Sequence, residues 1–436
     1  MSVNLFSKQF LINEALSLLS RLEMVKPFAL NMPMVVAANI PDEALKGITD
    51  LIVIGNRELK KGVQDYINWI KRPDNQHLSI EEIQSRFALL KLRFNALLDE
   101  LDIFADVTSQ RSEHDTGVWV AGLDSLAEDA LNIKGNYYNP PPIICFLERG
   151  HGAAIRRART RLPGGKLSPV AVIQVPRERM VGSGIASSLI HEVGHQGAAL
   201  LDLVTSIRQE IKKRSEKSQD PAWDMYYRWL SEIIADFWAM GHLGIGATIG
   251  LVSVVSLPRY FMFRAKLDDP HPFPWIRVKI SLAFGNAMYP HPQWQRFEAL
   301  WQSMYPLDKL DDETDQIIES LLQIMPQFID LVINHSPPVL RGQRLVDIFP
   351  YRTRQPLQLR RLYEVWSNSP DLIGSAPASL VFAVIGQAHA DATISARRES
   401  KLLSDWLTRS AFLRSENRTK RESRNIIHEI KNLITD

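Results

Sequence analysis

The apolar residues of the first 135 or so positions recur at the spacing of amphipathic helices. At positions 48–70 they repeat three and four residues apart, and the pattern stops before Pro73, because proline cannot continue a helix. A second helical pattern follows Ser79 and Glu82, which have the spacing of a capping box, and it runs through Leu101. The amino-terminal part of the chain is therefore predicted to be mainly helical.

The pattern changes after three consecutive prolines at 140–142, the strongest boundary signal in the chain. Positions 142–147 and 169–176 are short runs of apolar residues, many of them β-branched, and are typical of buried strands. Helical patterns return from Trp294 to the end. We therefore expect an α+β, mostly helical protein. Its predicted regions are a helical N-terminal domain (1–138), a core with a short sheet (139–292) and a helical C-terminal region (293–436).

The central region contains the most informative motif of the chain, His191-Glu192-Val-Gly-His195. The surrounding residues, Ile185 to Leu201, are compatible with an apolar helix that follows the second predicted strand. On a helix, residues four apart are neighbours, so the two imidazoles can bind one metal ion. Glu192 then lies beside the open metal position, where a carboxylate can act as a general base. Two ordinary histidines on a core or surface helix are the alternative.

A catalytic zinc site needs a third protein ligand. A third histidine six residues after His195 is excluded because that position is Leu201, and Asp202 lies about 10 Å further along the helix if the helix continues. Glu232 is the better candidate. It shares a helix face with Asp236, which we expect to accept the free ring N–H of a ligand histidine. A solvated acidic edge, or a carboxylate pair bound to arginine, is the alternative for these two residues.

At this point the chain resembles the gluzincin group of zinc metallopeptidases, in which HExxH is followed by ExxxD. A third segment, from His271-Pro272 to Arg277, is similar to the HP-x4-R segment of the group that contains the CaaX prenyl endopeptidases. The resemblance covers about residues 165 to 280. It implies a small zincin-like catalytic core, formed by a short sheet, the HExxH helix and the glutamate helix. It also implies that Arg277 helps to order the active site and that His271 lies in a segment that closes over it.

Two residues are candidates for stabilising an oxyanion. Prolines at 270, 272 and 274 are expected to exclude helix and to hold His271 on an extended segment, from which its imidazole can donate a hydrogen bond. A structural histidine in a proline-rich turn is the alternative. Tyr289 is a second, weaker candidate for the same role, since many tyrosines simply close a core.

Composition and charge narrow the class of protein. With 436 residues, 45% of them hydrophobic and 23% charged, the chain has the composition of a soluble globular protein. The single cysteine, Cys145, excludes an intramolecular disulfide framework and, with no visible secretory signal, favours the cytoplasm. The net charge of +2 gives no strong field for nucleic acid, and no nucleic-acid partner is expected.

Two further segments bear on partners. Residues 237–257 are apolar and nearly long enough to span a membrane. A buried helix is the favoured interpretation, and membrane association is the alternative. Residues 397–431 contain ten basic and five acidic side chains. A solvated helix face is the default interpretation of such a pattern. The alternative is a docking tail for an anionic lipid or for an acidic protein partner of the helical C-terminal region.

The sequence as a whole predicts an intracellular zinc metallopeptidase that hydrolyses peptide or protein substrates. His191, His195 and Glu232 would hold Zn²⁺, with Glu192 as general base and Asp236 orienting a ligand histidine. Two alternatives remain. One is a zinc-binding scaffold or regulatory protein whose metallopeptidase site is structural or inactive, and the other is a zinc-dependent hydrolase of a non-peptide amide.

Overall fold

A computed structural model describes residues 3–28, 32–75, 77–149, 153–176, 182–264, 269–308 and 310–435 of the chain, without the side chains of residues 3 and 421–435. The end of the basic stretch 397–431 therefore lies outside the described side chains. Helices hold 74% of the residues, and the rest includes a small three-stranded mixed sheet, which confirms the α+β, mostly helical class.

The chain divides into two compact units, and each contains several separate segments. Unit 1 consists of Met1–Val120, Pro141–Phe146 and Arg156–Val172, and unit 2 consists of Ala121–Pro140, Leu147–Ile155 and Ile173–Asp436. The three predicted regions, with boundaries at 138/139 and 292/293, stay a prediction.

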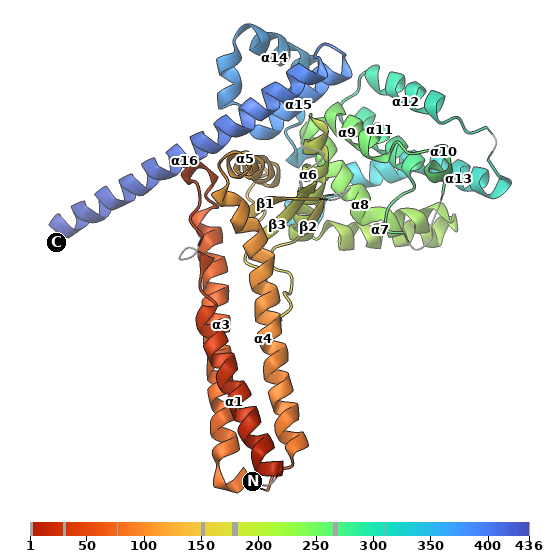
Figure 1. Ribbon diagram of the computed structural model, residues 1–436. Coiled ribbons are helices and arrows are strands. Elements are labelled where there is room, and N and C mark those ends of the chain that lie inside the picture. The colour runs from red at the N-terminus through yellow and green to blue at the C-terminus, as the bar shows by residue number, and fades with distance from the viewer. Residues whose placement is uncertain are drawn as a thin grey trace. The chain divides into compact units, whose positions relative to one another are not determined.

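Long helices dominate unit 1 (Figure 1). They are α1 (Val3–Met24), α3 (Asp42–Lys71) and α4 (Ile80–Ser109), with one-turn 3-10 segments η1 (Val36–Ala38), η2 (Pro73–Asn75) and η3 (Gln110–Ser112). The capping box is confirmed, because Glu82 N–H donates to the Ser79 hydroxyl while the Ser79 N–H donates to the Glu82 carboxylate. Buried leucine, isoleucine and phenylalanine side chains join the three long helices in one core.

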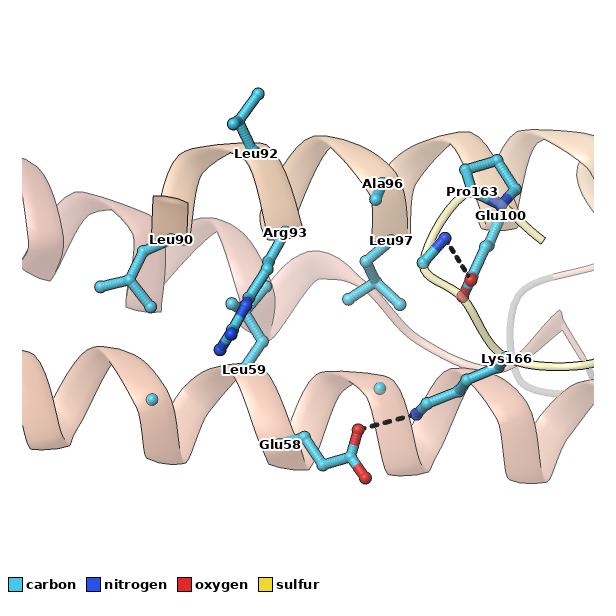
Figure 2. Close-up of a pocket in the computed structure, with 13 residues that line it drawn as sticks. Glu58, Leu59, Leu90, Leu92, Arg93, Ala96, Leu97, Glu100, Pro163 and Lys166 are labelled. Carbon is cyan, nitrogen blue, oxygen red and sulfur yellow. Dashed lines mark hydrogen bonds and ion pairs between the residues drawn. The ribbon is translucent and has the colours of Figure 1, made fainter. Parts of the chain in front are cut away.

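The connector at residues 157–170, between strands β2 (Ala154–Arg156) and β3 (Ala171–Pro176), is attached to α3 and α4 by polar contacts (Figure 2). The Gly164 N–H donates to Glu100 at 2.9 Å, and the Lys166 ammonium lies 2.9 Å from the Glu58 carboxylate. Beside these contacts is a pocket of about 510 Å³, lined partly by leucines of both helices. Burial raises the pKa of Glu100, although the Gly164 bond and Lys166 oppose this shift. These contacts pair Glu100 with the connector and Lys166 with Glu58.

The sheet contains β1 (Ile143–Glu148), β2 (Ala154–Arg156) and β3 (Ala171–Pro176), in the order β1-β3-β2. Both predicted strands are confirmed, and the short β2 was not predicted. Cys145 lies on β1 with its side chain buried, within a continuous run of apolar residues. β3 leads toward the helix that carries the HExxH motif.

The remaining helices belong to unit 2, except that α5 begins in unit 1. They are α5 (His114–Leu131), α6 (Gly184–Leu200), α7 (Leu203–Ser218), α8 (Ala222–Leu243), α9 (Ile245–Val255), α10 (Arg259–Met262), α11 (Pro274–Met288), α12 (Gln293–Met304), α13 (Asp312–Ile333), α14 (Pro356–Asn368), α15 (Ala378–Ala390) and α16 (Ala396–Thr435). Short 3-10 segments, η5 (Pro338–Leu340), η6 (Leu345–Ile348), η7 (Tyr351–Arg354) and η8 (Pro370–Ser375), separate the later helices. The helical pattern predicted from Trp294 onward is confirmed.

The apolar segment 237–257 is not one helix. α8 ends at Leu243 and α9 begins at Ile245, because Gly244 between them adopts φ +57° and ψ −132°, a conformation that only glycine adopts readily. By length and hydropathy, one helix of the described residues, α13, is apolar enough to cross a membrane, and 44% of that stretch is buried. The core helix of a soluble protein passes the same test, so α13 is weak evidence for membrane association.

Candidate metal centre

The HExxH motif lies on α6, and its register is set by close packing against α8. Apolar residues on one side of α6, including Ile190 and Val193, are buried. On the side toward α8, the glycines allow the two helices to approach. A Cβ at Gly194 would lie 2.8 Å from the Ala235 Cα, and a Cβ at Gly197 would lie 2.5 Å from the Trp238 ring. Glycine at positions 194 and 197 is therefore required by the packing of α6 on α8.

Three side chains predicted as metal ligands are brought together by this packing. Among the described residues, His191, His195 and Glu232 form the group whose donor atoms all lie within 4.8 Å of one another. The Glu232 carboxylate lies 3.2 Å from His191 Nε2 and 3.5 Å from His195 Nε2. Two ligands bound tetrahedrally at about 2.1 Å from zinc lie about 3.4 Å apart. The two distances from Glu232 to the imidazoles are close to this value, so the three side chains form a candidate metal site.

Asp236 occupies the position expected for an orienting carboxylate. It lies one turn after Glu232 on α8, and its Oδ1 is 2.7 Å from His191 Nδ1. A carboxylate accepts, so Nδ1 carries the proton and the lone pair of a neutral His191 is on Nε2, which faces Glu232. Arg277 holds Asp236 in turn, with its Nε and Nη2 donating at 2.7 and 2.9 Å. The arginine thus acts on the centre through Asp236, and its Nη2 lies 4.0 Å from Glu232.

His271 also reaches the centre. Its Nε2 lies 3.2 Å from Glu232, and its Nδ1 and backbone N–H both lie 2.9 Å from the Asp269 carboxylate. About half of its side chain is exposed, whereas the side chains of the three candidate ligands are 12–17% exposed. Residues 269–273 are outside any helix, as predicted, but residues 270 and 271 lie in a bend, and the prediction is wrong at Pro274. That proline is the first residue of α11, a position where its missing N–H costs nothing, so Arg277 lies on the first turn of a helix.

The chain matches no protein-family model, no curated protein and no solved structure.

The ionisable groups of the centre shift one another's pKa values, because opposite charges lie close together. Burial opposes a charge on His191, but Asp236 and Glu232 outweigh it and raise its pKa to about 9. Burial also opposes ionisation of Glu232, yet its hydrogen bonds with His191 and His271 hold its pKa far below the usual range. The pKa of Asp236 is likewise lowered, because the charges of Arg277 and His191 outweigh its burial. Glu232 and Asp236 are therefore carboxylates throughout the physiological pH range.

Glu192 differs from these two carboxylates. Its side chain is buried, and burial raises its pKa above the usual range, with only partial compensation from His191. A glutamate with a raised pKa is suited to accept and return a proton near neutral pH.

The other residues considered as ligands or oxyanion donors have structural places. The Tyr289 hydroxyl is buried and donates to the Gly241 carbonyl, nine residues or roughly 13 Å along α8 from Glu232. The prediction of Tyr289 as an oxyanion donor is therefore wrong. α6 ends at Leu200, and Asp202 adopts φ 50° between α6 and α7, so it does not continue the HExxH helix.

Two contacts of the centre were not predicted. Ser231 Oγ lies 3.4 Å from His195 Nδ1, and Asp269 holds His271 as described above. Ser231 precedes Glu232 on α8, and Asp269 begins the proline-rich segment, so both stand beside predicted residues. Both are polar residues close in sequence to candidate ligands, and this was the only sign in the sequence that they could contact the centre.

Proposed function

We propose that the protein is a zinc-dependent endopeptidase whose centre is formed by His191, His195 and Glu232. The observation that carries this proposal is the convergence of the three donors beside a buried glutamate with a raised pKa. The order of HExxH, ExxxD and HP-x4-R along the chain, similar to that of gluzincins, supports it. A zinc ion with three protein ligands supplies Lewis acidity and a water molecule of lowered pKa.

The chain's own groups would divide the remaining work. Glu192 accepts a proton from the attacking water and returns it to the leaving amine, as its raised pKa permits. Asp236 and Arg277 keep the His191 ring in one orientation. His271, exposed at the edge of the centre, donates from Nε2 to the negatively charged oxygen that develops on the scissile carbonyl.

The contact between His271 and Glu232 also favours a second candidate function. Structural zinc sites have four protein ligands, whereas catalytic sites keep one position open. If His271 joins the three donors, the centre is closed, and the protein is a zinc-binding scaffold or regulatory protein.

Metal analysis and a peptide-library assay test these proposals together. For the endopeptidase we expect one equivalent of zinc in wild-type protein and in the Glu192→Gln variant, and cleavage by wild type only. Glu216→Gln, the same change on an exposed residue of α7, is the matched control and should cleave normally. Zinc binding without cleavage of peptides by any variant would support the scaffold, and cleavage of small amides alone would support the non-peptide hydrolase. A wild-type protein that binds no zinc refutes all three.

A further inference from the structure

The first turn of α16 contacts the start of the metal-binding helix. Glu399, which is only 3% exposed, lies on that turn, and its Oε1 accepts the N–H of Ser183 at 2.5 Å. Ser183 is the residue directly before α6 and lies 216 positions away in sequence. The N-terminus of a helix carries a partial positive charge and unpaired N–H groups, so a buried carboxylate there is a strong acceptor.

The neighbours of Glu399 fix its orientation. Its second oxygen, Oε2, lies 2.6 Å from Nδ1 of His389 on α15, so both carboxylate oxygens are engaged. Gly182 adopts φ +96° at the turn before Ser183, and a Cβ there would lie 3.3 Å from Glu399 Oε1. The glycine thus gives the chain the left-handed turn that presents the Ser183 amide to the carboxylate.

α9 holds the same half of α6. The Ser187 hydroxyl donates to the Ala247 carbonyl at 2.9 Å, and Gly184 packs against Gly250, where an added Cβ would lie 3.2 Å from the Gly184 Cα. The ligand half of α6 is held separately, by its packing on α8. From Ser183 to His191 the helix rises roughly 12 Å, so a shift at its start is passed along a continuous helix to the ligands.

We propose that Glu399 is a positioning residue of the metal centre, which sets the axial position and rotation of α6 through the Ser183 amide and thereby the placement of both imidazoles. The inference rests on the proposed function only in that α6 binds metal. It requires no catalytic turnover. It also assigns the first turn of α16 to the support of the centre, although no local sequence feature connects residue 399 with the HExxH motif.

Zinc affinity separates a positioning role from a merely structural one. Dissociation constants are measured by chelator competition at a temperature where all the variants are folded, as circular dichroism establishes. We expect Glu399→Ala to weaken zinc binding about 10- to 100-fold, as loss of a group that orients a ligand does. Glu399→Gln keeps an oxygen that accepts the Ser183 N–H and should recover most of the affinity. Glu416→Gln, an exposed change on the same helix, should bind like wild type.

Hydrogen exchange of the α6 amides gives a second readout. Faster exchange in Glu399→Ala at residues 183–195, with recovery in Glu399→Gln, supports the proposal. Equal zinc affinity of wild type and Glu399→Ala overturns it, as does an alanine defect that glutamine does not reduce. If wild-type protein binds no zinc, the proposed function fails. In that case, unchanged hydrogen exchange of α6 in Glu399→Ala overturns the positioning role as well. Faster exchange supports the part of the proposal in which Glu399 fixes the position of α6.

Discussion

Replacing Gly194 with alanine tests whether the spacing of α6 and α8 creates the metal centre. The added Cβ would lie 2.8 Å from both the Ala235 Cα and the Trp238 Cβ, roughly 1 Å inside an ordinary carbon–carbon contact. Such overpacking costs about 1–3 kcal/mol, while alanine gains about 1 kcal/mol over glycine in a helix interior. The net loss of stability is therefore small, about 0–2 kcal/mol. The larger effect is on the position of Glu232, because the added Cβ displaces α8, the helix that carries Glu232.

A displacement of α8 by roughly 0.5 Å exceeds the tolerance of a zinc–ligand bond, so we expect zinc affinity to fall about 10- to 100-fold, or about 1.4–2.7 kcal/mol. Chelator competition measures the affinity, and urea unfolding with excess chelator measures the stability of the fold. Gly62→Ala on α3 is the control, because its Cβ would lie 3.4 Å from Leu90 and needs only a small adjustment there. It should leave zinc binding unchanged. If Gly194→Ala binds zinc as tightly as wild type, helix spacing does not determine the geometry of the centre.

Three other changes probe the charges of unit 2. Asp236→Asn should weaken zinc binding about 10- to 100-fold at unchanged helix content, because the His191 ring loses its charged acceptor; equal affinity would contradict its orienting role. The pKa of His191 is raised to about 9, so zinc must displace a proton from its ring below that pH. Zinc affinity should therefore rise about tenfold per pH unit from pH 7 toward 9. Calorimetry in buffers of different ionisation enthalpy should show the release of close to one proton per zinc ion bound. A pH-independent affinity would contradict that shift. Burial, aided by the charge of Arg354, lowers the pKa of His242 to about 3. The contribution of neutral His242 to the free energy of unfolding is therefore complete above about pH 6.5. It is lost at about 1.4 kcal/mol per pH unit as the pH falls toward 3. Urea unfolding should show this loss in wild type relative to His242→Leu, and parallel pH curves would refute it.

Local signals were enough to predict the end of α3 before Pro73 and the start of α4, but not every helix boundary. The capping box at Ser79 acts within one turn, so its sequence alone determines the start of α4. The break at Gly244 was missed because glycine within an apolar run is compatible with both a continuous helix and a left-handed turn. At Pro274 the error was of another kind. Proline excludes a helix interior but is favoured at its first position, and the sequence does not say which of the two applies.

Some residues of the candidate site could likewise be predicted from local spacing, whereas others depend on contacts between segments far apart in the sequence. His191 and His195 could be paired because helical spacing alone places them on one face. Glu232 was identified by its spacing from Asp236 and by resemblance, and its distance from the imidazoles depends on how α8 packs on α6. Glu399 could not be identified, because its contact with the start of α6 depends on the path of more than 200 intervening residues.

The balance of charge at this cluster is compatible with a bound cation. Arg277 makes its two short bonds with Asp236, so the charges of that pair largely cancel. Glu232 remains a buried carboxylate whose nearest partners are imidazoles, and an imidazole compensates its charge only when protonated. A proton on His191 and a divalent ion bound at His191 Nε2 are therefore alternative compensating charges. They exclude each other, because both the protonated ring and the metal use the same nitrogen lone pair.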